Sequence, residues 1–203
     1  MRPTATESGL SWIAAPAKPV RPRDARQLID ELERLHPLIR AHSRAVAVIA
    51  GRLARALGAD GADEATVRLA GSVHDVGKLT IPRTVLDKPG ALTRSEWELV
   101  RRHPVEGERL LRPMFGDRPT VLAAVRWHHE RWDGLGYPDG LPATRAPLGA
   151  RIIAAADAFQ AMLEARPYRR QCTVDHALDE LEAHAGTQFD PQCVRALRDT
   201  LRS

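Results

Sequence analysis

The chain has 203 residues, of which 43% are hydrophobic and 28% charged. This balance is ordinary for a globular protein and excludes wholesale disorder, and a chain of this length can bury a core without disulfide bonds. The 30 basic residues exceed the 26 acidic residues by four, and because they stand among acidic neighbours rather than in one basic cluster, we expect no binding to DNA.

The sequence predicts neither a membrane span nor a disulfide. No apolar run approaches the roughly 20 residues that a membrane span requires. The longest candidate for a signal-peptide core, Leu10 to Ala15, contains Ser11, so no leader is predicted and we expect a cytoplasmic protein. The two cysteines, Cys172 and Cys193, fit no zinc motif and are expected to be reduced thiols.

The chain divides into a short lead-in and one domain. Residues 1–23 contain four prolines among small polar residues, which predicts a flexible N-terminal segment. From residue 24 onward apolar residues recur at helical spacing, and no segment alternates as a strand would. Residues 24–203 are therefore predicted to form one all-α domain, a helical bundle.

The helices can be placed along the chain from apolar spacing and end signals. The predicted helices cover residues 28–35, 39–57, 65–75, 93–100, 120–129, 150–165, 174–181 and a last one from 191. Thr93 and Glu96 form a capping-box pattern, and Asp190 with Pro191 is typical of a helix start. Residues 133–140 are too rich in glycine and proline for a helix and are predicted to be a loop.

Histidines are concentrated near the predicted helix ends. Five of the eight histidines, with two aspartates, could face one centre: His42, His74, Asp75, His103, His128, His129 and Asp157. A single helical histidine is more often a surface or core-edge residue than a ligand, and an aspartate can cap or pair locally. Asp157, however, lies in the apolar segment 153–159, where an ionised carboxylate is costly unless it is paired or binds a metal.

The consecutive pair His128-His129 adds a geometric condition. Neighbours on a helix point about 100° apart, so both can face one centre only where the helix ends. The glycine-rich loop that follows predicts such an end. Imidazole and carboxylate donors without nearby cysteines favour a divalent first-row metal over a structural zinc site.

Two motifs resemble a known family. The run His74-Asp75-Val76-Gly77-Lys78 and the segment from His128 through Gly136-Tyr137-Pro138 strongly resemble the HD-GYP family of bacterial phosphodiesterases, within the HD metal-dependent phosphohydrolases. The resemblance covers residues 35–200, and its Gly-Tyr-Pro segment is highly specific. It implies an HD-domain helical bundle with a glycine-rich loop, acting as a hydrolase of cyclic dinucleotides, chiefly cyclic di-GMP, to pGpG or GMP.

The resemblance also implies a ligand set for two divalent ions, iron or manganese. One ion would be held by His42, His74, Asp75 and Asp157. The second would be held by Asp75, as a bridge, with His103, His128 and His129. Such a pair can supply an activated water and stabilise charge on a phosphodiester.

Substrate contacts follow from the same resemblance. The implied substrate-binding residues are Lys78, Gly136, Tyr137, Arg166 and Arg169. The implied catalytic residues are Asp75, as the bridge between the ions, and Lys78, since its ammonium group would reach a phosphate oxygen. The ordinary alternatives are a surface lysine and, for Arg169, a solvated helix end. Gly134 and Gly136 are expected to allow positive φ and close backbone approach.

Departures from the family pattern leave alternatives open. Leu38 stands where some members place a glutamate for a third metal, so we expect a dinuclear centre. Gln160 stands where many members have a second aspartate. One alternative is therefore a non-catalytic receptor or adaptor that binds cyclic dinucleotides or diguanylate cyclase domains with a GGDEF motif. The other is an HD phosphohydrolase for another nucleotide, such as cyclic GMP-AMP.

Overall fold

The computed structural model describes residues 25–142, 145–164 and 172–202. Over these ranges the chain is helical with connecting loops, and the one β-type contact is an isolated bridge between Ala185 and Phe189. The predicted all-α class is confirmed. The predicted flexible segment 1–23 lies outside the described residues.

The described helices follow the predicted order closely. They are α1 (Ala25–Leu35), α2 (Pro37–Ala56), α3 (Gly61–Val73), the 3-10 helix η1 (Val76–Thr80), α4 (Arg83–Leu86), α5 (Arg94–Val100), α6 (His103–Phe115), α7 (Pro119–Trp127), α8 (Leu148–Leu163), α9 (Val174–Ala183) and α10 (Pro191–Arg202). The short helices η1 and α4 and the 13-residue helix α6 were not predicted. None of the described helices is long and apolar enough to cross a membrane.

Local capping explains several helix boundaries. The Thr93 side chain accepts the Glu96 amide, and the Glu96 carboxylate accepts the Thr93 amide, so the predicted capping box at α5 is confirmed. At the start of α10 the Asp190 carboxylate accepts the Gln192 amide. Asp60 caps α3 through two backbone amides. These contacts satisfy amides that lack an intrahelical partner.

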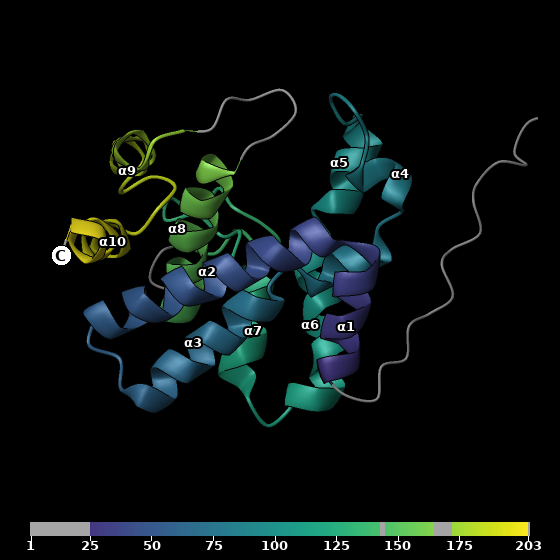
Figure 1. Ribbon diagram of the computed structural model, residues 1–203, viewed down its shortest axis with the longest axis horizontal. Coiled ribbons are helices and arrows are strands. Elements are labelled where there is room, and N and C mark those ends of the chain that lie inside the picture. Colours follow the sequence, from purple (N-terminus) through teal and green to yellow (C-terminus); the bar gives the residue numbers. More distant parts are fainter. Residues whose placement is uncertain (1–24, 143–144, 165–171, 203) are drawn as a thin grey trace, which may run out of the picture.

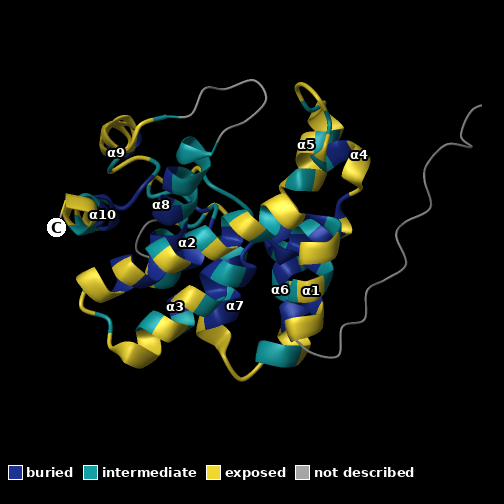
Figure 2. Cartoon of the chain, viewed as in Figure 1, coloured by how far each residue is buried: buried dark blue, intermediate teal, exposed yellow. Residues whose placement is uncertain are grey.

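Helix α2 crosses the centre of the fold (Figure 1). It packs against α3 and α8 and also contacts α1 and α10, while α6 packs against α7 and η1. Helices α9 and α10 lie at the end of the molecule opposite α4 and α5. Buried residues of α1, α2, α3, η1 and α6 to α10 meet in one apolar core (Figure 2). Polar side chains are rare inside it, yet His74, His103 and His128 are among its fully buried large side chains.

Candidate metal centre

Seven predicted ligands come together from five parts of the fold. Their positions are His42 in α2, His74-Asp75 after α3, His103 at the start of α6, His128-His129 after α7, and Asp157 in α8. Ligand atoms within each of two groups lie within 4.8 Å of one another: His42, His74 and Asp75; His103, His128 and His129. Asp157 joins the first group through Oδ1, 2.7 Å from Nε2 of His42. Helix α7 ends at Trp127, as the consecutive histidines required.

Three histidines stand at helix ends and are held by the same backbone contact. Each ring Nδ1 donates to the carbonyl three residues earlier: His74 to Gly71 (2.8 Å), His103 to Val100 (2.7 Å) and His128 to Val125 (2.6 Å). The last carbonyls of a helix lack intrahelical partners, so a ring N–H can satisfy one of them. Because a carbonyl only accepts, Nδ1 carries the proton and Nε2 is left as an acceptor.

These remaining acceptors point toward one another. Nε2 of His103 lies 3.2 Å from Nε2 of His128 and 3.3 Å from Oδ1 of Asp75. Nε2 of His74 and Oδ1 of Asp75 are buried without a hydrogen-bond partner among the described residues. Buried acceptors that face one another are costly unless a cation lies between them. The donor set therefore fits a divalent metal.

Asp75 occupies the middle of the cluster. Its Oδ2 lies 3.5 Å from Nε2 of His74 and accepts a 2.6 Å hydrogen bond from Nζ of Lys78. Burial alone would raise the pKa of Asp75, but the charge of Lys78 holds that pKa well below its usual value. The carboxylate is therefore ionised at neutral pH and faces both groups of histidines.

His42 is held differently, by two carboxylates. Its Nε2 contacts Asp157 at 2.7 Å, and its Nδ1 contacts Oε1 of Glu164 at 2.8 Å. Burial acts to lower the pKa of His42, but the hydrogen bond and charge of Asp157 outweigh it and raise the pKa to about 9. In the absence of metal this imidazole is protonated at neutral pH.

The histidines of the second group have the opposite electrostatics. Burial lowers the pKa of His103 to about 3 and that of His129 to about 4, and it holds the pKa of His128 well below its usual value. These three imidazoles are neutral at physiological pH, which is the form that coordinates metals.

Gly77 allows the His74-Asp75 pair to lie against α6. A Cβ at Gly77 would stand 1.9 Å from the His103 carbonyl oxygen and 2.6 Å from the Gly107 amide. Those atoms belong to the backbone and cannot swing aside. The glycine therefore sets the spacing between Asp75 and His103.

The Gly-Tyr-Pro loop is ordered by a buried carboxylate. Glu130 is 6% exposed and accepts the amides of Asp139, Gly140 and Leu141 at 2.7–3.0 Å. Gly134 has a φ of 77°, as expected, whereas Gly136 does not have positive φ, which corrects the prediction for that residue. Its role is close approach, because a Cβ there would stand 2.4 Å from the Arg131 amide.

Tyr137 lies directly over a predicted ligand. Its ring stacks on that of His129 with centroids 4.8 Å apart and an interplanar angle of 25°. The central carbon of the Arg101 guanidinium lies 4.7 Å from the centroid of the same phenol ring. Burial raises the pKa of the Tyr137 hydroxyl, so the phenol stays neutral. The stack sets the orientation of His129 at the edge of the cluster.

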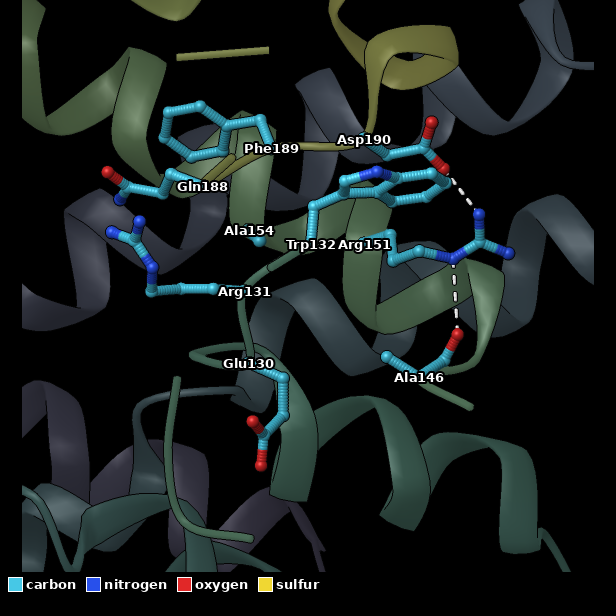
Figure 3. A pocket seen from close by; sticks show the side chains of 9 residues that line it. All are labelled: Glu130, Arg131, Trp132, Ala146, Arg151, Ala154, Gln188, Phe189 and Asp190. Atoms are coloured by element: carbon cyan, nitrogen blue, oxygen red, sulfur yellow. Dashed lines mark hydrogen bonds and ion pairs between the residues drawn. The ribbon is translucent and has the colours of Figure 1, made fainter. Parts of the chain in front are cut away.

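A second set of contacts fixes the loop from behind. Figure 3 shows Arg151 reaching both Asp190 and the Ala146 carbonyl, beside the Trp132 ring. The Trp132 amide donates to the Gln188 carbonyl at 3.1 Å. None of the seven cluster residues lines the pocket in Figure 3. This pocket is therefore part of the loop support rather than of the candidate metal centre.

Sequence reasoning missed some contacts, and two of its residues remain unplaced. Glu164 follows Asp157 by seven residues on the same helical face, a spacing that could have indicated it. No sequence signal pointed to Arg101 or to the buried role of Glu130. Arg166 and Arg169 lie outside the described residues.

Comparisons of sequence place the chain beside known proteins. A family model described as HD domain matches residues 26–193. The chain is 47% identical over 151 residues to "Cyclic di-GMP phosphodiesterase response regulator RpfG" of Xanthomonas campestris pv. campestris, covering 73% of this chain and 40% of that protein. It is 38% identical over 165 residues to "3'3'-cGAMP-specific phosphodiesterase 3" of Vibrio cholerae, covering 81% of this chain and 36% of that protein. The chain thus spans less than half the length of these curated relatives.

The fold also resembles a solved structure. Bd1817, described as an HDG"Y"P protein from Bdellovibrio bacteriovorus, matches with a TM-score of 0.67 over 88% of this chain and 58% of that chain. At 22% sequence identity this match shows a shared fold.

Proposed function

Because this chain belongs to the HD domain family, we propose that it is a metal-dependent phosphodiesterase that hydrolyses cyclic di-GMP to pGpG or GMP through a dinuclear centre. The matched region contains both the His74-Asp75 pair and the Gly-Tyr-Pro loop, in agreement with the HD-GYP resemblance of the sequence. The observation that carries the proposal is the convergence of buried acceptor atoms from His74, Asp75, His103 and His128.

The proposed ligand sets follow the two groups in the structure. His42, His74 and Asp157 would hold one ion; His103, His128 and His129 would hold the other; and Asp75 would contact both. When bound, the two ions would supply charge stabilisation for the phosphodiester and an activated water. Imidazole and carboxylate donors without thiolates support iron or manganese. Leu38, 85% exposed, offers no donor for a third ion.

Other residues would bind and orient the substrate. The Lys78 ammonium uses one of its three donors on Asp75, so two remain for a phosphate oxygen. Tyr137 presents an aromatic ring beside His129, and Gly136 brings the loop backbone close to it. Arg166 and Arg169 keep their proposed role in phosphate binding.

The loop also supports a proposed protein contact. Leu135, at the tip of the Gly-Tyr-Pro loop, is 77% exposed. We propose this tip as the contact for a GGDEF-type cyclase domain, and replacement of Leu135 by aspartate should weaken capture of such a domain.

A second substrate is favoured by a specific observation. The relative from Vibrio cholerae is named as specific for 3'3'-cGAMP, so cyclic GMP-AMP is the alternative substrate for this chain. The two dinucleotides differ in one base, and a difference in turnover would therefore reflect base recognition rather than the metal centre.

The test is a substrate panel on one preparation of defined metal content. Manganese- or iron-loaded protein, prepared under reducing conditions, is incubated with cyclic di-GMP and with cyclic GMP-AMP, and products are separated by chromatography. We expect linear pGpG or GMP from cyclic di-GMP at the higher kcat/KM. Tight binding of either dinucleotide without turnover, with both metals confirmed, would favour a receptor and contradict the proposal.

A further inference from the structure

His42 differs from the helix-end histidines in having no backbone carbonyl to orient its ring. It lies inside α2, where carbonyls are engaged in the i to i+4 hydrogen bonds of the helix. His74, His103 and His128 each use a carbonyl at the end of a helix instead. The His42 Nδ1 therefore needs an acceptor from another element.

Glu164 supplies that acceptor. Its Oε1 lies 2.8 Å from Nδ1 of His42 and also accepts Nε2 of Gln160 at 3.2 Å. Glu164 is the C-cap residue that directly follows α8, and its amide donates to the Gln160 carbonyl at 3.2 Å. Both its backbone and its carboxylate are thus tied to the helix that carries Asp157.

The two sides of the His42 ring have different partners. Nε2 faces Asp157 and the cluster, whereas Nδ1 faces Glu164 on the opposite side of the imidazole. Glu164 is therefore placed to act on the ring rather than to be a ligand of the cluster. A carboxylate that accepts from a metal-ligating imidazole fixes its tautomer and orientation.

We propose that Glu164 is a positioning residue that holds His42 with its proton on Nδ1, so that Nε2 faces the ion shared with His74 and Asp157. This inference rests on the proposed dinuclear centre. It makes the cluster asymmetric, because His42 depends on a side-chain carboxylate next to α8, whereas His74, His103 and His128 are oriented by backbone carbonyls.

The asymmetry can be measured with metal alone. Metal-free wild-type protein and variants are titrated with manganese against a chelator that competes for it. Glu164→Ala should weaken one of the two manganese sites by about 10–100-fold and leave the other unchanged. Glu164→Gln, which keeps an oxygen acceptor, should retain both affinities within about threefold, because the tautomer depends on acceptance by that oxygen.

A matched control separates this role from loss of a surface carboxylate. Glu180 lies 3.8 Å from His184 in an exposed pair on α9, so Glu180→Ala removes a comparable glutamate–histidine contact away from the cluster. This variant should bind manganese as the wild type does. Circular dichroism should show the same helical content for all variants, because the Glu164 side chain is 32% exposed and no core is disturbed.

A second readout follows the tautomer itself. In zinc-loaded protein, histidine-selective nitrogen NMR should show the His42 proton on Nδ1 in the wild type and in Glu164→Gln, and a changed His42 signal in Glu164→Ala.

The outcomes separate the two proposals. Wild-type protein that binds fewer than two manganese ions would contradict the dinuclear centre itself. Wild-type protein that binds two ions, with Glu164→Ala unchanged at both, would overturn only the positioning role. An equal loss in Glu164→Gln and Glu164→Ala would also overturn it, because the acceptor would then not be what matters.

Discussion

The helix-end histidines and the mid-helix pair His42–Asp157 belong to one cluster but are held in different ways. At the helix ends, backbone carbonyls orient buried imidazoles. Within α2 and α8, one imidazole lies between two carboxylates, and its side chain is 10% exposed. Backbone contacts persist as long as the helices do, whereas side-chain contacts can be altered by one substitution. The positions of the helix-end histidines are therefore set by the fold, and that of His42 by particular side chains.

Replacement of Asp75, which lies between the two proposed metal sites, should have the largest effect on metal binding and activity. Asp75 faces both His74 and His103, so Asp75→Ala should reduce binding at both metal sites and lower activity by more than about 100-fold. Metal content by mass spectrometry and cyclic di-GMP hydrolysis measure this. Asp63→Ala, at an exposed position in the first turn of α3, is the control. Two bound metals with wild-type turnover in Asp75→Ala would refute the bridging role.

The next largest effect should come from a substitution at Gly77, which would disturb the backbone around His74, Asp75 and His103. Gly77→Ala forces a Cβ against the His103 carbonyl and the Gly107 amide, and overpacking of a core typically costs about 1–3 kcal/mol. Urea denaturation should show a large loss of unfolding free energy. Gly61→Ala, where an added Cβ meets no atom within 4 Å, should unfold much as the wild type does. Equal stability of the two variants would show that α6 can move away.

The sequence predicted the helix-end half more fully than the mid-helix half. The end of α7 followed from His128-His129 and the glycine-rich loop, and the start of α5 from Thr93 and Glu96, because end signals are local. The contact between His42 and Glu164 joins residues 122 positions apart, and no local pattern encodes it. Helix α6 was not predicted either, although it has 13 residues; it begins at His103 and has a proline in its first turn. The helices η1 and α4 have five and four residues, too few for a periodic signal.

Lowering the pH should reduce the unfolding free energy of metal-free protein, because His103 and His129 are held neutral in the folded state. His103 and His129 have folded pKa values of about 3 and 4, below the ordinary 6.5. Between about pH 4 and 6.5 the unfolded state therefore binds more protons, and stability falls as the pH falls. The slope is about 1.4 kcal/mol per pH unit for each such imidazole. Urea denaturation of chelator-treated protein at a series of pH values measures this slope. An unfolding free energy that does not change over this range would contradict the buried neutral form of these imidazoles.

Raising the pH should lower the unfolding free energy of metal-free protein through His42, by less than acid does through His103 and His129. His42 has a folded pKa of about 9, above the ordinary 6.5. Its stabilising contribution is therefore complete below pH 6.5 and is lost as the pH rises to 9, with a slope near 1.4 kcal/mol per pH unit. The same denaturation series on His42→Gln should lack this alkaline loss. If the variant kept it, another group would be responsible.

The most direct test is a crystal structure of manganese-loaded protein with anomalous scattering recorded for the metal. The crystal should contain two ions about 3.5 to 4 Å apart, with Asp75 between them, His42, His74 and Asp157 on one ion, and His103, His128 and His129 on the other. A single ion in metal-replete crystals, or ions bound away from Asp75, would contradict the proposal that the two halves form one dinuclear centre.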